Sequence, residues 1–158
     1  MGNGPNGFGG LYAFGARSFS IWNSRGEQVW DSGDQLEQRT TSLPNVQFNA
    51  SNTDNALDDR SDNKGPEPEG VVVARFGRKT FAFIGLERTG GVMVYDVTTP
   101  TSPAFVTYAS SRIGAGGDLG PEGLAVVAAD DSPNGKPLLI VGNEVSGTTA
   151  IFQINLQP

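Results

Sequence analysis

The chain has 158 residues and a formal charge of −6, from 17 acidic and 11 basic side chains. This length suits one domain, and the acidic balance lacks the basic face that nucleic-acid binding requires. The sequence has no cysteine and no histidine, which excludes disulfides, zinc sites and Ser-His-Asp triads. Any metal would therefore be a hard cation with oxygen ligands, calcium or magnesium, and we expect no zinc, haem or nucleotide cofactor.

The N-terminal residues 1–10 are rich in glycine and asparagine and lack the basic and apolar stretches of a signal peptide. We expect a flexible terminus there, and no apolar run reaches the about 20 residues of a membrane span. Residues 11–158 are predicted to form one repeat-containing domain. Leu11–Gly15 and Ser18–Trp22 predict two short strands, so residues 11–32 would form a partial copy of the repeat.

A long polar stretch, residues 33–64, is rich in Asn, Asp, Ser and Thr. Its composition predicts a solvated insertion loop or, alternatively, a functional loop that crosses one face of the domain. The stretch ends in Asp58–Lys64, which leads directly into the first clear repeat phrase. No segment of the chain shows the hydrophobic period of a helix.

The phrase Pro68-Glu69-Gly70-Val71 lies in the first full copy of the repeat, residues 65–109. Turn residues separate runs of apolar and β-branched residues, which is the pattern of successive antiparallel strands. Its predicted strands are 70–75, 80–86, 91–97 and 105–108.

The phrase Pro121-Glu122-Gly123-Leu124 marks a second copy, residues 118–158. Its predicted strands are 124–129, 137–142 and 148–156. Each copy also has an acidic turn after its second strand, at Glu87 and at Glu144. Four short antiparallel strands in each repeat of about fifty residues are typical of a β-propeller blade. We therefore predict an all-β fold, a partial β-propeller of about two full four-stranded blades plus part of a third.

Propellers close with typically four to eight blades, more than this sequence encodes. The chain is predicted to be a piece of a larger propeller, one of several copies that close a propeller together, or an open stack. Its expected partners are therefore the remaining propeller blades or further copies of the chain.

An antiparallel meander brings the start of strand one and the end of strand two to the same edge of a sheet. Glu69, Glu87, Glu122 and Glu144 would then share one rim, with Asp62 in a connection on the same face. These carboxylates predict a calcium or magnesium site, because a bound cation relieves their mutual repulsion. The alternative is that each glutamate accepts hydrogen bonds from backbone N–H groups and fixes the blade geometry.

Three cationic side chains, Arg17, Lys64 and Arg88, are predicted on the same face and could hold a phosphate group. No catalytic residue is assigned, because a serine nucleophile has no obvious base in a chain without histidine. Asn49-Ala50-Ser51 satisfies the N-glycosylation pattern, a tripeptide that often occurs by chance.

Five phrases of the sequence resemble the choice-of-anchor I proteins, secreted β-propellers related to proteins labelled alkaline-phosphatase-like and mesenchyme-specific cell surface glycoprotein-like. The phrases are Gly15–Trp22, Asp59–Gly70, Phe83–Arg88, Asp118–Gly123 and Val141–Gly147. The resemblance runs from about Leu11 to Ile154 and matches the C-terminal part of such proteins. It implies an extracellular or cell-surface location, and the acidic face resembles that of calcium-dependent phytase-like propellers.

Two functions remain open at this point. The first is an extracellular module for binding or adhesion, or a structural part of a larger propeller, with calcium at its rim. The second is a calcium-dependent phosphatase or phytase-like phosphoesterase, in which the metal polarises a phosphoester and a rim carboxylate activates water. The ligand would accordingly be an extracellular protein or a phosphoester, and the resemblance assigns no catalytic residue.

Overall fold

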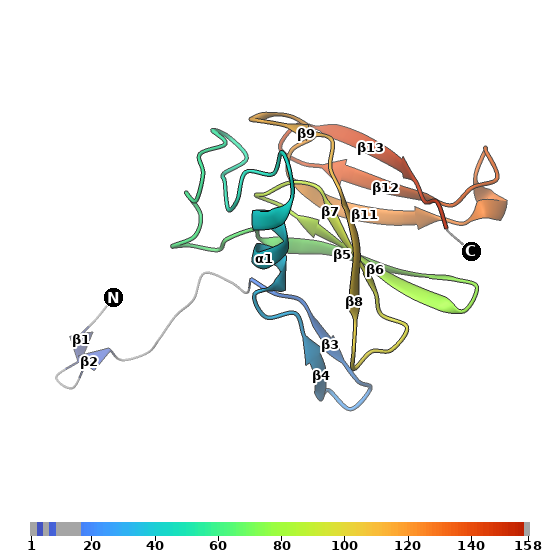
Figure 1. Ribbon diagram of the computed structural model, residues 1–158, viewed down its shortest axis with the longest axis horizontal. Helices are drawn as coiled ribbons and strands as arrows, with labels where there is room; N and C mark the ends of the chain where they lie inside the picture. The colour runs from blue at the N-terminus through green and yellow to red at the C-terminus, as the bar shows by residue number, and fades with distance from the viewer. Residues whose placement is uncertain (1–2, 5–6, 9–16, 157–158) are drawn as a thin grey trace.

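The computed structural model describes residues 3–4, 7–8 and 17–156 and shows an all-β protein with one α-helix. All the strands pair in antiparallel sheets, and the sheets formed from Ser20 onward lie side by side without closing into a barrel (Figure 1). Two of these are short pairs, β1 (Asn3–Gly4) with β2 (Gly7–Phe8) and β9 (Arg112–Ile113) with β10 (Gly116–Gly117). The fold is a partial β-propeller, as the repeat pattern predicts.

The first blade is a four-stranded meander in sequence order. Its strands are β5 (Pro68–Phe76), β6 (Lys79–Leu86), β7 (Val92–Asp96) and β8 (Ala104–Ala109). A two-residue turn joins the first two strands, since Phe76 pairs with Lys79 and Gly77 has a φ of 60°. These strands match the predicted ones closely, because turn residues delimit each apolar run.

The second blade has three strands within the described residues. They are β11 (Pro121–Val127), β12 (Leu138–Asn143) and β13 (Thr148–Gln153). A short 3-10 helix, η1 (Ala129–Asp131), lies in the β11–β12 connection. The register shifts at the start of the first strand in both blades, after Pro68 and after Pro121. The Pro-Glu-Gly phrase therefore forms a bulge that starts each blade.

The two blades pack face to face, with β11 lying against β5 and β6. A buried apolar cluster fills the space between them. The buried members are Phe83, Val92 and Val94 from the first blade and Leu139 and Val141 from the second. Because alternate residues of a strand point to opposite faces, only half of each strand contributes to this interface.

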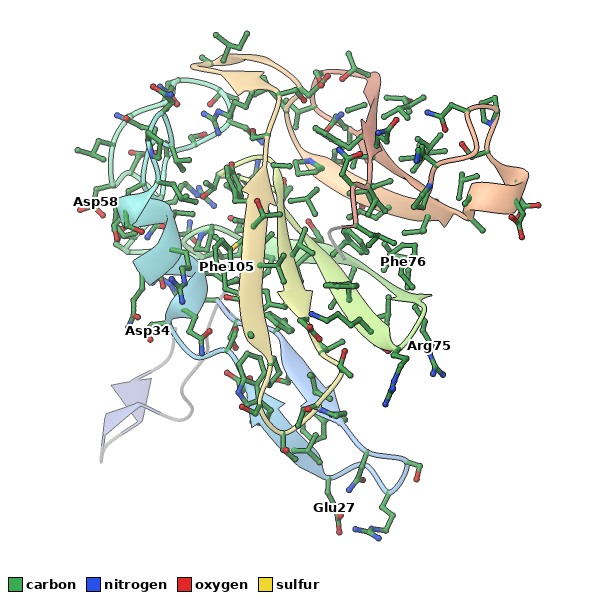
Figure 2. All side chains as sticks on the ribbon, turned by 45° about the vertical axis from the view of Figure 1, so that its right-hand side comes forward. Glu27, Asp34, Asp58, Arg75, Phe76 and Phe105 are labelled. Atoms are coloured by element: carbon green, nitrogen blue, oxygen red, sulfur yellow. The ribbon has the colours of Figure 1, made fainter. Side chains whose placement is uncertain are left out.

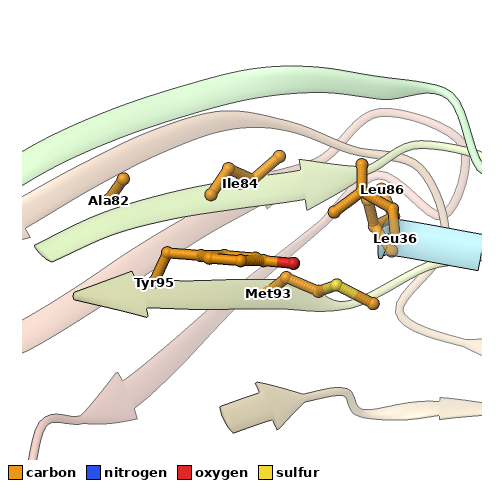
Figure 3. Packing of buried hydrophobic residues seen from close by; sticks show 6 residues of the cluster. All are labelled: Leu36, Ala82, Ile84, Leu86, Met93 and Tyr95. Atoms are coloured by element: carbon orange, nitrogen blue, oxygen red, sulfur yellow. The ribbon is translucent and has the colours of Figure 1, made fainter. Parts of the chain in front are cut away.

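A second cluster covers the opposite face of the first blade around Tyr95 and Met93. Figure 3 shows these two side chains below Ile84 on the neighbouring strand. The Tyr95 ring also contacts Phe19, at 4.9 Å between ring centroids, and Trp30, at 6.3 Å.

Phe19 and Trp30 belong to the hairpin of β3 (Ser20–Trp22) and β4 (Gln28–Asp31). This hairpin covers the outer part of the first blade, the position that the preceding blade occupies in a propeller. Its strand β3 falls where the sequence predicts one, over Ser18–Trp22. The other strand predicted for this partial copy, Leu11–Gly15, lies outside the described residues.

Helix α1 (Gln35–Ser42) lies in the segment that the sequence composition predicts to be a polar loop. The helix buries just two residues, Leu36 and Thr40, one turn apart. Such a narrow stripe gives no visible hydrophobic period. Leu36 reaches Leu86 in the core (Figure 3), and Arg39 lies 4.8 Å from the ring centroid of Phe105, beside the helix in Figure 2.

The rest of the polar segment is a series of turns that is partly buried. Left-handed backbone occurs at Asn45, Asn49, Asn55 and Asp58, the residue types that tolerate it best after glycine. Asn49 and Asn52 are buried, so the segment is not simply solvated. In the described part of the chain, no helix is long and apolar enough to span a bilayer.

Candidate functional site

The predicted site glutamates occupy equivalent backbone positions in the two blades. The N–H of Glu87 donates to the carbonyl oxygen of Glu67 at 2.8 Å. The N–H of Glu144 donates to the carbonyl oxygen of Gly120, also at 2.8 Å. Since Glu69 and Glu122 lie in the bulges that open β5 and β11, all four predicted carboxylates come from the same edge of their sheets.

We call these four residues the acidic rim: Glu69, Glu87, Glu122 and Glu144. Neighbouring carboxyl groups of the rim interact with one another, within each blade and between the blades. Glu87 lies within hydrogen-bonding reach of Glu69, and Glu122 within reach of Glu144. Glu69 and Glu122 are close enough to repel each other electrostatically. The tertiary structure therefore places four of the five carboxylates proposed for a metal site along one rim, as two pairs. The fifth, Asp62, is exposed in the polar segment, and no hydrogen bond or ion pair joins it to the rim in the described residues.

Glu67 is a site residue that sequence reasoning missed. Its side chain is only 5% exposed and forms ion pairs with Arg60 at 2.7 Å, Lys64 at 2.9 Å and Arg88 at 3.4 Å. Its backbone is left-handed, with a φ of 52°. The sequence does contain a signal for a special backbone position at Glu67, because Pro66 and Pro68 flank it. Proline restricts both its own backbone and that of the residue before it.

The carboxyls of Glu67 and Glu87 form an asymmetric pair. Burial favours the neutral form of Glu67, but hydrogen bonds from Lys64 and Arg60 outweigh it and lower the pKa of Glu67 to about 2. Burial, together with the contacts to Glu67 and Glu69, raises the pKa of Glu87 to about 7. Near neutral pH, Glu67 is therefore an anion and Glu87 carries a proton for much of the time.

A milder like-charge effect acts in the second blade. The adjacent Glu144 carboxyl, by hydrogen bonding and by charge, raises the pKa of Glu122. No cationic side chain pairs with either residue in the described part of the chain. The second-blade end of the rim thus carries uncompensated negative charge.

The three cations predicted to hold phosphate are each paired with a glutamate. Arg17 contacts Glu37 through two nitrogens, at 2.7 and 3.1 Å, and donates to the carbonyl oxygen of Ser61 at 2.7 Å. Lys64 and Arg88 both contact Glu67, and Arg88 also lies 3.1 Å from Glu87. A phosphate group would have to compete with these carboxylates, and Arg17 does not join the other two at one carboxylate.

Within the described residues, no three acidic side chains lie close enough together to hold a metal ion. The rim offers pairs of carboxyl groups instead. Calcium takes six to eight oxygen ligands, so a rim site would draw further ligands from backbone carbonyls, water or neighbouring blades.

The N-glycosylation pattern at Asn49 lies in the interior of the protein. Asn49 is buried, and its Nδ2 donates to Glu37 at 2.6 Å and to Ser61 at 2.9 Å. The amide nitrogen that would carry a glycan is thus engaged in the folded protein, where it helps to hold Glu37 in place beside Arg17.

Comparison with known proteins identifies the family of the chain. The family model of the choice-of-anchor I domain matches residues 2–100, more than half of the chain. Gigasin-3a of Magallana gigas is 32% identical over 163 residues, covering 91% of this chain. The chain spans 57% of the length of Gigasin-3a. No solved structure matches the chain. The chain belongs to the choice-of-anchor I domain family.

Proposed function

We propose that this chain is a sector of an extracellular β-propeller, which packs against further blades and serves as a binding or adhesion module. The family name points to anchoring at a cell surface or to secretion. One observation carries the proposal. Each blade has apolar residues that are buried where it faces the other blade, and the equivalent residues on the two outward faces of the pair are exposed.

The first of these open faces belongs to β5. Val71 corresponds to Leu124 of the second blade, as the pairing of Pro68 with Leu86 and of Pro121 with Asn143 shows. Leu124 packs between the blades, whereas Val71 is 61% exposed. A preceding blade would cover Val71 just as the first blade covers Leu124.

The second open face belongs to β13. Ile151 of the second blade corresponds to Val94 of the first. Ile151 pairs with Ile140, and Val94 pairs with Phe83, which holds the same place in the second strand of its blade. Val94 is 9% exposed, whereas Ile151 is 63% exposed. Covering a valine or isoleucine fully contributes about 1.5–3 kcal/mol, so both faces favour association with a further blade.

Self-association of the isolated chain tests this proposal. The open face on β5 corresponds to the face by which the second blade packs on the first, and the open face on β13 corresponds to its partner. The two faces can therefore join copies of the chain head to tail. We expect association that increases with concentration in analytical ultracentrifugation and that is weakened by Val71→Ser and Ile151→Ser. Val106→Ser, at an exposed valine on the outermost strand β8, is the matched control. A chain that stays monomeric and binds no hydrophobic dye would overturn the proposal.

The finer part of the proposal is that the acidic rim binds calcium. Its support is the contact between neighbouring carboxyl groups, at Glu87 with Glu69 and at Glu122 with Glu144, because a cation would relieve their repulsion when both are ionised. Calcium at one hundred times its Kd should stabilise the fold by about 2.7 kcal/mol.

Isothermal titration calorimetry with calcium chloride and the calcium dependence of Tm test the rim. The paired variant Glu122→Gln with Glu144→Gln should lose the response, whereas Glu27→Gln, on an exposed turn, should keep it. No heat and no Tm shift at millimolar calcium would refute the calcium site. Calcium-dependent hydrolysis of p-nitrophenyl phosphate would instead favour the alternative function, a phosphoesterase.

A further inference from the structure

A cavity of about 760 Å³ lies between the segment that follows α1 and the end of the first blade. Residues 44–47 and Asn55 line one side. Thr89 of the β6–β7 turn, Tyr108 of β8 and residues 112–114 line the other. The volume falls within the range of small-molecule binding sites, about 300–1,000 Å³.

Arg112 is the one charged residue that lines this cavity among the described residues, and its guanidinium is fully engaged. Its Nε donates to the Gly114 carbonyl oxygen at 2.7 Å, and Nη1 donates to those of Arg88 and Thr89 at 2.6 and 3.1 Å. Nη2 donates to the Ser51 carbonyl oxygen at 2.6 Å and to Asn55 Oδ1 at 3.0 Å. All five N–H donors are used, so none remains for an anionic ligand.

The hydrogen-bonding groups that remain are neutral. The Thr89 side chain is 3% exposed, and its Oγ1 has no hydrogen-bond partner within the described part of the protein. Asn55 uses its Oδ1 for Arg112, which leaves its Nδ2 to donate. Asn45 and Gln47 add two further amides. The Thr89 hydroxyl is shielded from the cavity, so the side-chain amides are the hydrogen-bonding groups that a ligand can reach.

Apolar surface lies beside these groups. The Tyr108 hydroxyl donates to the Gly90 carbonyl oxygen at 2.7 Å, which fixes the position of its ring. Ile113 is largely exposed, and Pro44 lies in the facing wall. The cavity thus combines neutral side-chain amides with an aromatic ring and aliphatic side chains.

We propose that this cavity binds a neutral saccharide. A side-chain amide donates and accepts at once, as adjacent sugar hydroxyls require. An aromatic ring and aliphatic groups suit the C–H face of a sugar. A charged ligand finds no free partner of opposite sign here. This cavity adjoins the acidic rim, because Thr89 follows Glu87 and Arg88 in the same turn, but the rim glutamates do not line it.

The test uses the full chain and three neutral disaccharides, cellobiose, maltose and lactose, followed by saturation-transfer NMR and calorimetry. Digalacturonate and inorganic phosphate are the charged comparisons. We expect at least one neutral disaccharide to bind more tightly than either anion. Failure of all three to bind at millimolar concentration, or tighter binding of an anion, would overturn the proposal.

Gln47→Ala is the decisive variant, because Gln47 lines the cavity and no hydrogen bond of its side chain to the described residues would be lost. Loss of one hydrogen bond to the ligand should weaken binding about tenfold with an unchanged Tm. Thr149→Val, at an exposed position on β13, should bind like the parent chain. Unchanged affinity in Gln47→Ala would contradict the assignment, and Asn45→Ala should weaken binding in the same direction.

Discussion

The backbone at Gly70 touches the backbone of the next blade at Glu122: a Cβ atom at Gly70 would collide with the Glu122 carbonyl oxygen. The neighbouring strand shows the same closeness, since a Cβ at Gly85 would lie 2.9 Å from the Pro121 carbonyl oxygen. The glycine of the first Pro-Glu-Gly phrase therefore allows the second phrase to pack directly against it. This contact places the glutamates of the two blades on one rim.

Gly70→Ala should lower the free energy of unfolding by about 1–3 kcal/mol, the usual cost of overpacking a close contact. Gly123 is the matched control, because it holds the equivalent place in the second blade and has open space around it. Gly123→Ala should leave stability unchanged or raise it by up to about 1 kcal/mol. Urea unfolding measures both, and equal effects would contradict the packing of the blades.

The proton on Glu87 should make stability depend on pH. Its pKa rises from an ordinary 4.5 to about 7 in the folded protein, so the folded state binds more protons than the unfolded state between these values. The contribution of Glu87 is complete below pH 4.5 and is lost as the pH rises through 7, a change of the order of 3 kcal/mol.

Unfolding of Glu87→Gln across pH 4 to 8 tests this titration, because a neutral amide keeps the shape of the protonated acid. The variant should lack the decline between about pH 4.5 and 7. Glu144→Gln, at the equivalent but exposed position, should retain the decline. A Glu87→Gln profile parallel to that of the parent would show that Glu87 is ionised throughout this range.

Glu67→Gln should be strongly destabilising, because it leaves Arg60, Lys64 and Arg88 without their shared carboxylate. Breaking a buried ion pair by removing one partner costs about 3–5 kcal/mol. The lowered pKa of Glu67 means that this stabilisation is complete above pH 4.5 and is lost as the pH falls towards 2.

Guanidinium unfolding at pH 7 compares this variant with Glu27→Gln, which breaks the exposed pair with Arg25. The exposed pair should contribute nothing measurable. If the two variants had similar unfolding midpoints, the ion pairs of Glu67 would stabilise the fold no more than the exposed pair does.

Arg112→Ala should release the segment around Ser51 and Asn55 from the first blade, because the guanidinium bonds both to this segment and to the Arg88 and Thr89 carbonyls. We expect faster amide hydrogen exchange and faster proteolysis in residues 44–57, with a loss of about 1–3 kcal/mol in stability. Arg75→Ala, on the exposed side of β5, is the control. Unchanged exchange in residues 44–57 would show that other contacts hold the segment.

The strands could be predicted because each is encoded locally, by apolar residues between turn residues such as Gly77 in the β5–β6 hairpin. Helix α1 could not, because only Leu36 and Thr40 face the core and the rest of its surface is polar. Four rim glutamates were predictable from the repeat and from the antiparallel pairing. Glu67 was not, since its importance depends on Arg60, Lys64 and Arg88, which approach it only in three dimensions.

The sequence by itself determined that this protein is a repeat of antiparallel blades, without histidine or cysteine chemistry, and with glutamates at corresponding edges. Periodicity and turn residues are local properties, so they can be recognised along the chain. Only the tertiary structure decided that Glu87 is buried and has a raised pKa while Glu69, Glu122 and Glu144 are exposed. Burial and the distance between charges depend on how the blades pack, and these two quantities set the pKa of a carboxyl group.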